Sequence, residues 1–310
     1  KSIERAIDKR KNPPEIWRKI AKFAKPGIAA FSIFVAAIMG VTALYMSKGL
    51  KTGDLDPGAP ELRPDSRYNL DDKFITQNYS VSADVLIVMV ETPPDKCTTY
   101  DAMEVMDRFM WFIENADGVQ SAASVVSVSK RMVTGNNEGN LKWQELSKIE
   151  DILNNTVQNV PTGLLNTSCS LAPVIVFLRD HKAETLKTVT TAVQTFAREN
   201  NDVEIANFVL ASGNAGVEAA TNETSESAAG TMMWFVYAIV ILMCLITFDW
   251  SVSGVICIVT PLVLTSFLCE GLMAKFGMGV KVGTLPVIAL GVGIGVDYGI
   301  YIFSKMREYL

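Results

Sequence analysis

The chain has 310 residues, of which 49% are hydrophobic and 20% are charged, and its formal net charge is -5. An ordinary soluble protein is less apolar and a bare bundle of membrane helices is less charged, so the composition indicates a membrane anchor that carries a large water-exposed domain. The charge is unevenly distributed. Residues 1–26 hold nine Lys or Arg and three acids, whereas residues 50–230 hold 14 basic and 26 acidic residues, which argues against nucleic-acid binding.

The first 25 residues are basic and are interrupted by Pro13 and Pro14. Apolar side chains, including Trp17 and Ile20, lie among the lysines, a pattern typical of a short helix on an anionic membrane surface. We therefore interpret residues 1–25 as a cytoplasmic amphipathic linker, with a solvated linker as the alternative. Residues 26–48 follow as transmembrane helix 1, and the positive charge before it places the N-terminus in the cytoplasm.

Residues 49–230 are predicted to form an external α+β domain. It begins with a loop rich in Pro, Asp and Gly over Gly53–Leu70. Helices are expected over Tyr100–Asn115 and Ala183–Arg198, with an inserted polar helix over Leu141–Val160. Strands are expected over Ser82–Val90, Gly118–Val128, Ala172–Leu178 and Val203–Leu210. The resulting order, β-α-β, inserted helix, β-α-β, is that of a ferredoxin-like split fold.

Residues 231–310 are predicted to hold transmembrane helices 2–4, so the fold class is an α-helical membrane protein plus α+β. A small, polar, helical segment over Gly213–Gly230 leads into a span at Met232–Phe248. The next spans are Ser253–Phe276 and Val282–Met306, each long enough to cross a bilayer core of about 30 Å. An even number of spans returns the C-terminus to the cytoplasm and leaves the large domain outside.

The fourth span reads VGTLPVIALGVGIGVDYGIYIFSKM and carries no charge before Asp297. A carboxylate within hydrocarbon costs roughly 2.5 kcal/mol or more, so such residues usually pair, face a cavity or carry protons. Helix packing is predicted at four glycines, which let another helix approach closely: Gly291, Gly293, Gly295 and Gly299. Two alternatives are a dinucleotide-binding turn, whose third glycine is replaced by Val296, and a packed helix whose acid is merely capped.

The cysteines and the single histidine bear on redox state and on catalysis. Cys97 and Cys169 fall in the external domain, an oxidising location, so the sequence leaves open a disulfide or two free thiols. His181 opens a polar helix and is predicted to lie at the surface. With one histidine, a metal site and a Ser-His triad have little support, so we expect no metal, no cofactor and no catalytic residues.

The segment GVGIGVDYGIYI, Gly291–Ile302, resembles the fourth span of transporters of the resistance–nodulation–division (RND) superfamily, with the Asp297-Tyr298 pair as its most specific feature. The loop GDLDPGAPELRPDSRYN after the first span is similar to bacterial MmpL-type members, called predicted exporters. In that family two such halves form one protein of about twelve spans, and the basic lead-in favours the second half here.

The resemblance implies proton-motive-force-driven export of lipids or other hydrophobic substrates, with Asp297 and Tyr298 in a proton relay. It implies efflux by proton antiport at the bacterial inner membrane, with the large porter domain in the periplasm and no enzymatic activity. Expected partners are membrane lipids, the remaining half of the transporter, further copies in a homo-oligomer and periplasmic accessory proteins. The alternatives are a sterol-sensing transporter or receptor like Patched and Dispatched, and an accessory membrane protein without transport.

Overall fold

A computed structural model describes residues 22–158, 160–161 and 163–309, and the chain divides into two compact units. The helical unit comprises the residues up to Leu50, Thr231–Gly279 and the residues from Gly283 on. The sheet unit comprises Lys51–Gly230 together with Val280–Val282. The predicted amphipathic linker, residues 1–25, lies almost wholly outside the described residues.

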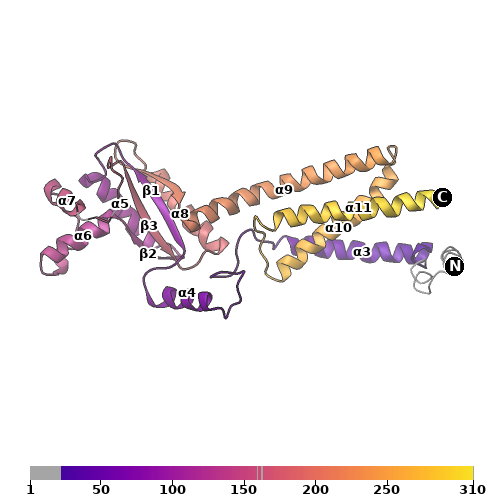
Figure 1. The fold of residues 1–310 in the computed structure, drawn as a ribbon, viewed down its shortest axis with the longest axis horizontal. Coiled ribbons are helices and arrows are strands. Elements are labelled where there is room, and N and C mark those ends of the chain that lie inside the picture. Colours follow the sequence, from indigo (N-terminus) through magenta and orange to yellow (C-terminus); the bar gives the residue numbers. More distant parts are fainter. Residues whose placement is uncertain (1–21, 159, 162, 310) are drawn as a thin grey trace, which may run out of the picture. The chain divides into compact units, whose positions relative to one another are not determined.

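Within the described residues, four helices are long and apolar enough to cross a membrane, and they lie at the places of the four predicted spans. They are α3 (Pro26–Ser47), α9 (Asn214–Thr247), α10 (Val252–Lys275) and α11 (Leu285–Tyr309), with a short 3-10 turn, η1 (Lys22–Ala24), before the first (Figure 1). The polar segment Gly213–Gly230 and the second span Met232–Phe248 were predicted as separate segments, but the structure joins them in the single 34-residue helix α9. Ala228, Ala229, Met232 and Met233 flank the junction at Gly230-Thr231, and no proline breaks the helix there.

In the helical unit, α10 packs against both α3 and α11. Small residues permit the close approach: a Cβ added at Gly271 would lie 3.1 Å from the backbone oxygen of Ala43 in α3. Near the start of α10, the ring of Phe248, which lies just before that helix, meets the ring of Phe303 of α11 edge to face, with centroids 4.8 Å apart. Most other apolar side chains of these helices are exposed, as expected for surfaces that face lipid or further helices.

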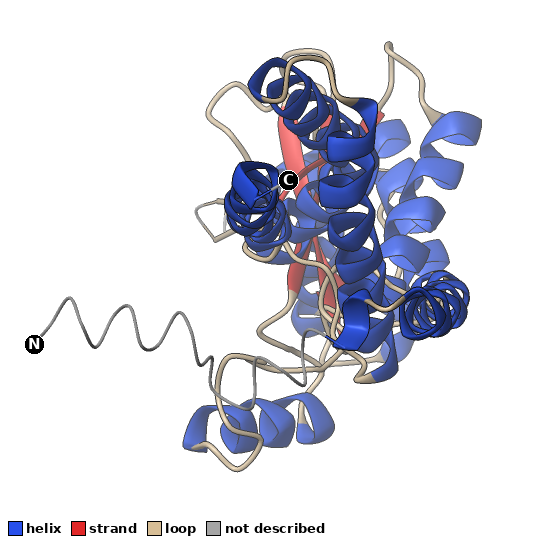
Figure 2. Cartoon of the chain, turned by 90° about the vertical axis from the view of Figure 1, so that its right-hand side faces the viewer, coloured by secondary structure: helices blue, strands red, loops and turns tan. Residues whose placement is uncertain are grey.

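The sheet unit holds four strands, β1 (Val85–Glu91), β2 (Val119–Ala123), β3 (Leu171–Leu178) and β4 (Asn207–Ser212). Their order is β2-β3-β1-β4, and all neighbours are antiparallel. The register pairs Val88 with Val174 on one side and with Leu210 on the other. Figure 2 shows the four strands in red.

Side chains alternate between buried and half-buried along β1 and β3, because successive residues of a strand point to opposite faces. One face is covered by α5 (Tyr100–Glu114) and α8 (Ala183–Asn200), whose apolar stripes bury against it. Phe109 of α5 sits at the centre, with ring centroids 5.1 Å from Phe196 and 4.9 Å from Phe208. The predicted strands and these two helices are therefore present, with shifted ends.

Three predicted segments differ from the structure. The strand predicted over Gly118–Val128 ends at Ala123, because Ser124 caps a new helix, α6 (Val125–Asn136), by accepting a hydrogen bond from the Val126 amide at 3.0 Å. The polar helix predicted over Leu141–Val160 is instead a 3-10 turn, η2 (Leu141–Trp143), and a short helix, α7 (Glu150–Val157). The strand predicted over Val203–Leu210 begins only at Asn207.

The loop predicted over Gly53–Leu70 also ends early, because helix α4 (Arg67–Asn78) begins within it. The Ser66 hydroxyl caps this helix by accepting a hydrogen bond from the Asn69 amide at 3.3 Å. No residue of α4 is buried, so the helix contributes little to the core.

Cys97 and Cys169 are joined by a disulfide in the structure, a state that the sequence left open. The bond links the loop before α5 to the loop before β3, and the Cys97 amide also donates a hydrogen bond to the Cys169 carbonyl at 3.1 Å. Cys97 is fully buried. The bond closes a chain segment of 72 residues.

Candidate functional site

Helix α11 presents a glycine face to α10. A Cβ added at Gly299 would lie 2.8 Å from a methyl carbon of Ile258, and one at Gly295 would lie 3.4 Å from Leu262. Glycine at these two positions therefore allows the two helices to pack at a distance that a larger residue would prevent. Gly291 and Gly293 have nothing within 4 Å of an added Cβ, so among the residues that the structure describes two of the four predicted packing glycines meet another helix.

Asp297 lies on the opposite side of α11 from this contact. Each residue advances a helix by about 100°, so Asp297, two residues from both Gly295 and Gly299, points roughly 160° away from them. Its side chain is exposed, and Tyr298 is 68% exposed. Gly293, one turn earlier, shares this uncovered face. Within the described chain the face is open to a further helix or to lipid.

A second group of charged side chains lies in the sheet unit. We name it the ion cluster and define it by its members, Asp54, Asp84, His181, Glu218 and Lys281. His181 Nδ1 lies 2.9 Å from Asp84 Oδ1, and His181 Nε2 lies 3.9 Å from Asp54 Oδ2. The Lys281 ammonium contacts the Asp54 carboxylate and lies 3.1 Å from Glu61 Oε1. Three acidic and two basic side chains thus lie together in a largely buried place.

Burial in this cluster contradicts the surface position predicted for His181, whose side chain is only 11% exposed. Its hydrogen bond to Asp84 raises the pKa of His181 to about 9, because the bond stabilises the imidazolium more strongly than burial disfavours it. Burial lowers the pKa of Lys281, but its hydrogen bonds to Asp54 and Glu61 outweigh that effect and hold the pKa above its ordinary value. Both side chains are therefore cations at neutral pH.

The raised pKa of His181 predicts that the protein is more stable at pH 6.5 than at pH 9. A group whose folded-state pKa exceeds its unfolded value stabilises the fold fully below the unfolded pKa, near 6.5, and loses that contribution as the pH rises through about 9. The loss is at most about 3 kcal/mol. Thermal unfolding in detergent, followed by circular dichroism at pH 6–9.5, should show it.

His181→Gln is the control for this prediction. Glutamine keeps a hydrogen bond to Asp84 but does not titrate, so its thermal midpoint should be flat over the same pH range. An equal slope in the variant and the wild type would assign the pH dependence to another group.

Three of the cluster's members also form a donor set that metals use. Ligand atoms of Asp54, His181 and Glu218 lie within 4.8 Å of one another. The Lys281 ammonium already contacts the Asp54 carboxylate and supplies positive charge there. We therefore interpret the cluster as an ion-paired network.

Comparison with known proteins identifies the family to which this chain belongs. The MMPL family matches residues 72–310, which include the whole sheet and helices α5–α11. This chain belongs to the MMPL family. No curated protein matches it. Members of the family are transporters of the RND type, so the chain is a multi-pass membrane protein of a transporter family, and the resemblance found in the sequence is confirmed at that level.

In this MMPL-family chain the matched region contains both Asp297 and the ion cluster, apart from Asp54, which lies before it. The sequence singled out Asp297 because a charge interrupts an apolar run. It did not single out Asp54 or Lys281, since each stands in a loop where charged residues are common, or Asp84, which lies near the polar start of the strand predicted over Ser82–Val90. One signal in the sequence could have indicated the cluster: the single histidine of the chain lies within an acidic domain, where an ion pair with a carboxylate is favoured.

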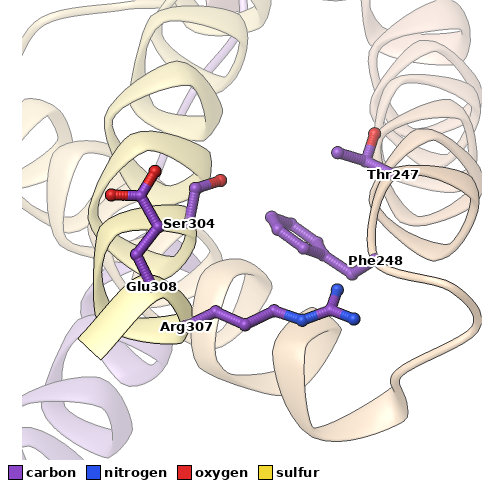
Figure 3. A pocket seen from close by; sticks show the side chains of 5 residues that line it. All are labelled: Thr247, Phe248, Ser304, Arg307 and Glu308. Carbon is purple, nitrogen blue, oxygen red and sulfur yellow. The ribbon is translucent and has the colours of Figure 1, made fainter. Parts of the chain in front are cut away.

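The helical unit also contains a cavity of about 250 Å³ between the ends of α9 and α11. Figure 3 shows Phe248 projecting from the end of α9 toward α11, with the Arg307 side chain extending beside it. Thr247, Ser304 and Glu308 complete the lining. Arg307 pairs with Asp249 at 3.0 Å, which links α11 to the turn between α9 and α10, and Glu308 pairs with Lys305 of the same helix at 2.6 Å. The charged side chains that line this cavity in the MMPL-family chain are therefore already ion-paired.

Proposed function

We propose that this chain is part of a proton-motive-force-driven exporter of lipids or other hydrophobic molecules, with Asp297 as a proton carrier and Tyr298 as its hydrogen-bonding neighbour. The observation that carries the proposal is Asp297 itself. It is an ionisable side chain in the middle of an apolar helix of an MMPL-family chain, on the face that α10 does not cover. Intramembrane acids with an accessible face commonly mark proton pathways.

The proposal extends to the architecture and the location. We assign the sheet unit as a ferredoxin-like porter domain, which the two β-α-β passes and the strand order β2-β3-β1-β4 support. We place this domain in the periplasm and the helices in the bacterial inner membrane, on the charge asymmetry about the first span. The uncovered face of α11 would receive a helix from the remaining half of the transporter. Homo-oligomers and periplasmic accessory proteins are further proposed partners.

Inside-out vesicles that contain the complete transporter test the exporter assignment. Respiration acidifies their lumen, and the proton gradient should then drive uptake of two probes, an NBD-labelled phospholipid and Nile red. Vesicles without the transporter are the control, and a protonophore should reduce uptake to their level. Uptake that persists with the protonophore would contradict proton coupling, and no uptake of either probe would contradict export of hydrophobic molecules.

A further inference from the structure

The residues just after α3 and just before α11 are joined in the sheet unit. The Gly53 amide donates a hydrogen bond to the Val280 carbonyl at 2.8 Å, and the Val280 amide donates one to the Lys51 carbonyl at 2.9 Å. Thr52 and Val280 thereby form an isolated parallel bridge. We name the paired residues 51–54 and 280–281 the clamp.

Gly53 is required at this position by its conformation and its surroundings. Its φ of +98° lies in the region that disfavours residues with a side chain. An added Cβ would also lie 2.5 Å from Asn222 Nδ2 and 2.9 Å from the Ala183 Cβ. The clamp is thus fitted closely against the start of α8 and against α9.

The ion cluster holds the clamp to the rest of the domain. Lys281 contacts Asp54 and Glu61, and the Asp54 carbonyl accepts a hydrogen bond from the Ala183 amide at 2.8 Å. Asp54 also faces His181, which is bound to Asp84 at the start of β1. The fifth member of the cluster is Glu218 of α9, whose carboxyl group lies near Asp54 and His181. A bridge of two hydrogen bonds is weak by itself, so these charged contacts supply most of its stability.

We propose that Lys281 is a positioning residue that couples α11 to the external domain, an inference that rests on the proposed function. Lys281 belongs to the sheet unit, and only residues 282–284 separate it from Leu285, where α11 begins. Asp297 lies on the same continuous helix, twelve residues beyond Leu285. Because so short a connection can absorb little movement, a shift of α11 on protonation must either move the domain or break the clamp.

Hydrogen exchange of the complete transporter in detergent tests the clamp directly. Lys281→Met removes the ammonium and keeps a long apolar side chain, and it should speed exchange of the Gly53 and Val280 amides by about tenfold or more. Lys281→Arg keeps the charge and should restore protection. Lys187→Met is the matched control, because it removes a lysine of the same unit whose side chain is 76% exposed. Unchanged protection in Lys281→Met would overturn the clamp.

Proton-driven uptake of the NBD-labelled phospholipid tests the coupling. Lys281→Met should lose at least about tenfold in uptake rate, with Lys281→Arg and Lys187→Met near wild type. Asp54→Asn should reproduce the loss, and the double variant should be no worse than either single one, because both remove the same ion pair.

The outcomes separate the clamp from the exporter. Normal uptake in Lys281→Met with lost amide protection would overturn the coupling and leave the exporter function standing. Absence of proton-driven uptake in the wild type would overturn the proposed function and the coupling with it, while hydrogen exchange would still decide whether the clamp exists. A lower thermal midpoint common to Lys281→Met and Lys281→Arg would assign the loss to folding and contradict the proposal.

Discussion

Asp297→Asn should reduce proton-driven uptake in inside-out vesicles to the level of vesicles without the transporter, while the thermal midpoint stays at the wild-type value. Asparagine has nearly the same shape and can hydrogen-bond, but its amide does not titrate. It also avoids the cost of a charge in hydrocarbon, roughly 2.5 kcal/mol or more. Since Asp297 is exposed on the face away from α10, the substitution leaves the packing of this chain intact.

Two variants control for this experiment. Asp249→Asn makes the same chemical change at an exposed acid that pairs with Arg307 at 3.0 Å, and it should transport normally. Tyr298→Phe removes one hydroxyl and leaves the carboxylate, so it should slow transport without stopping it. Normal transport by Asp297→Asn would show that this acid is not the proton carrier, and the proposed mechanism would then fail.

Reduction of the bond between Cys97 and Cys169 should destabilise the sheet unit by about 4 kcal/mol, because opening a 72-residue loop frees the unfolded chain. Comparison of the wild type with Cys97→Ala/Cys169→Ala, by thermal unfolding in detergent, measures the loss. Cys244→Ala is a control for the general effect of removing a buried cysteine, since its thiol is unbonded and lies in the helical unit.

Mass spectrometry without reductant checks the bond itself. The protein is alkylated in denaturant before digestion. A tryptic peptide pair linked through Cys97 and Cys169 is the expected product, with Cys257 and Cys269 alkylated because both are unbonded. If Cys97 and Cys169 are both alkylated in the denatured protein without reductant, the bond is absent and the destabilisation should vanish with it.

The sequence predicted the features that depend on local pattern. An uninterrupted apolar run of about 20 residues has few alternatives to a membrane span, so α3, α10 and α11 were found within a few residues of their ends. The same pattern did not show which glycines face α10: all four were predicted to pack, and Gly295 and Gly299 are the ones that meet that helix. The strand that follows α5 was extended too far, because Val and Ser continue beyond Ala123 and only the capping contact at Ser124 ends it.

The ion cluster could not be predicted, because it depends on tertiary contacts. Its five members come from five segments spread between residues 54 and 281, and each is an ordinary polar residue in its own segment. Only the packing of α8 and α9 beside the residues that follow α3 removes His181 from water. The clamp was missed for the same reason, since a single bridge between residues 52 and 280 has no periodic signature.

His181 is the only histidine of the chain, and it is held in the ion cluster. Histidine is the side chain whose ordinary pKa falls closest to neutrality, so its imidazole protons give magnetic resonance signals that shift with protonation. In this chain such a signal needs no assignment by mutagenesis, because one residue alone produces it. The imidazole signal of His181 can therefore report the protonation of the ion cluster beside the clamp, without any introduced label.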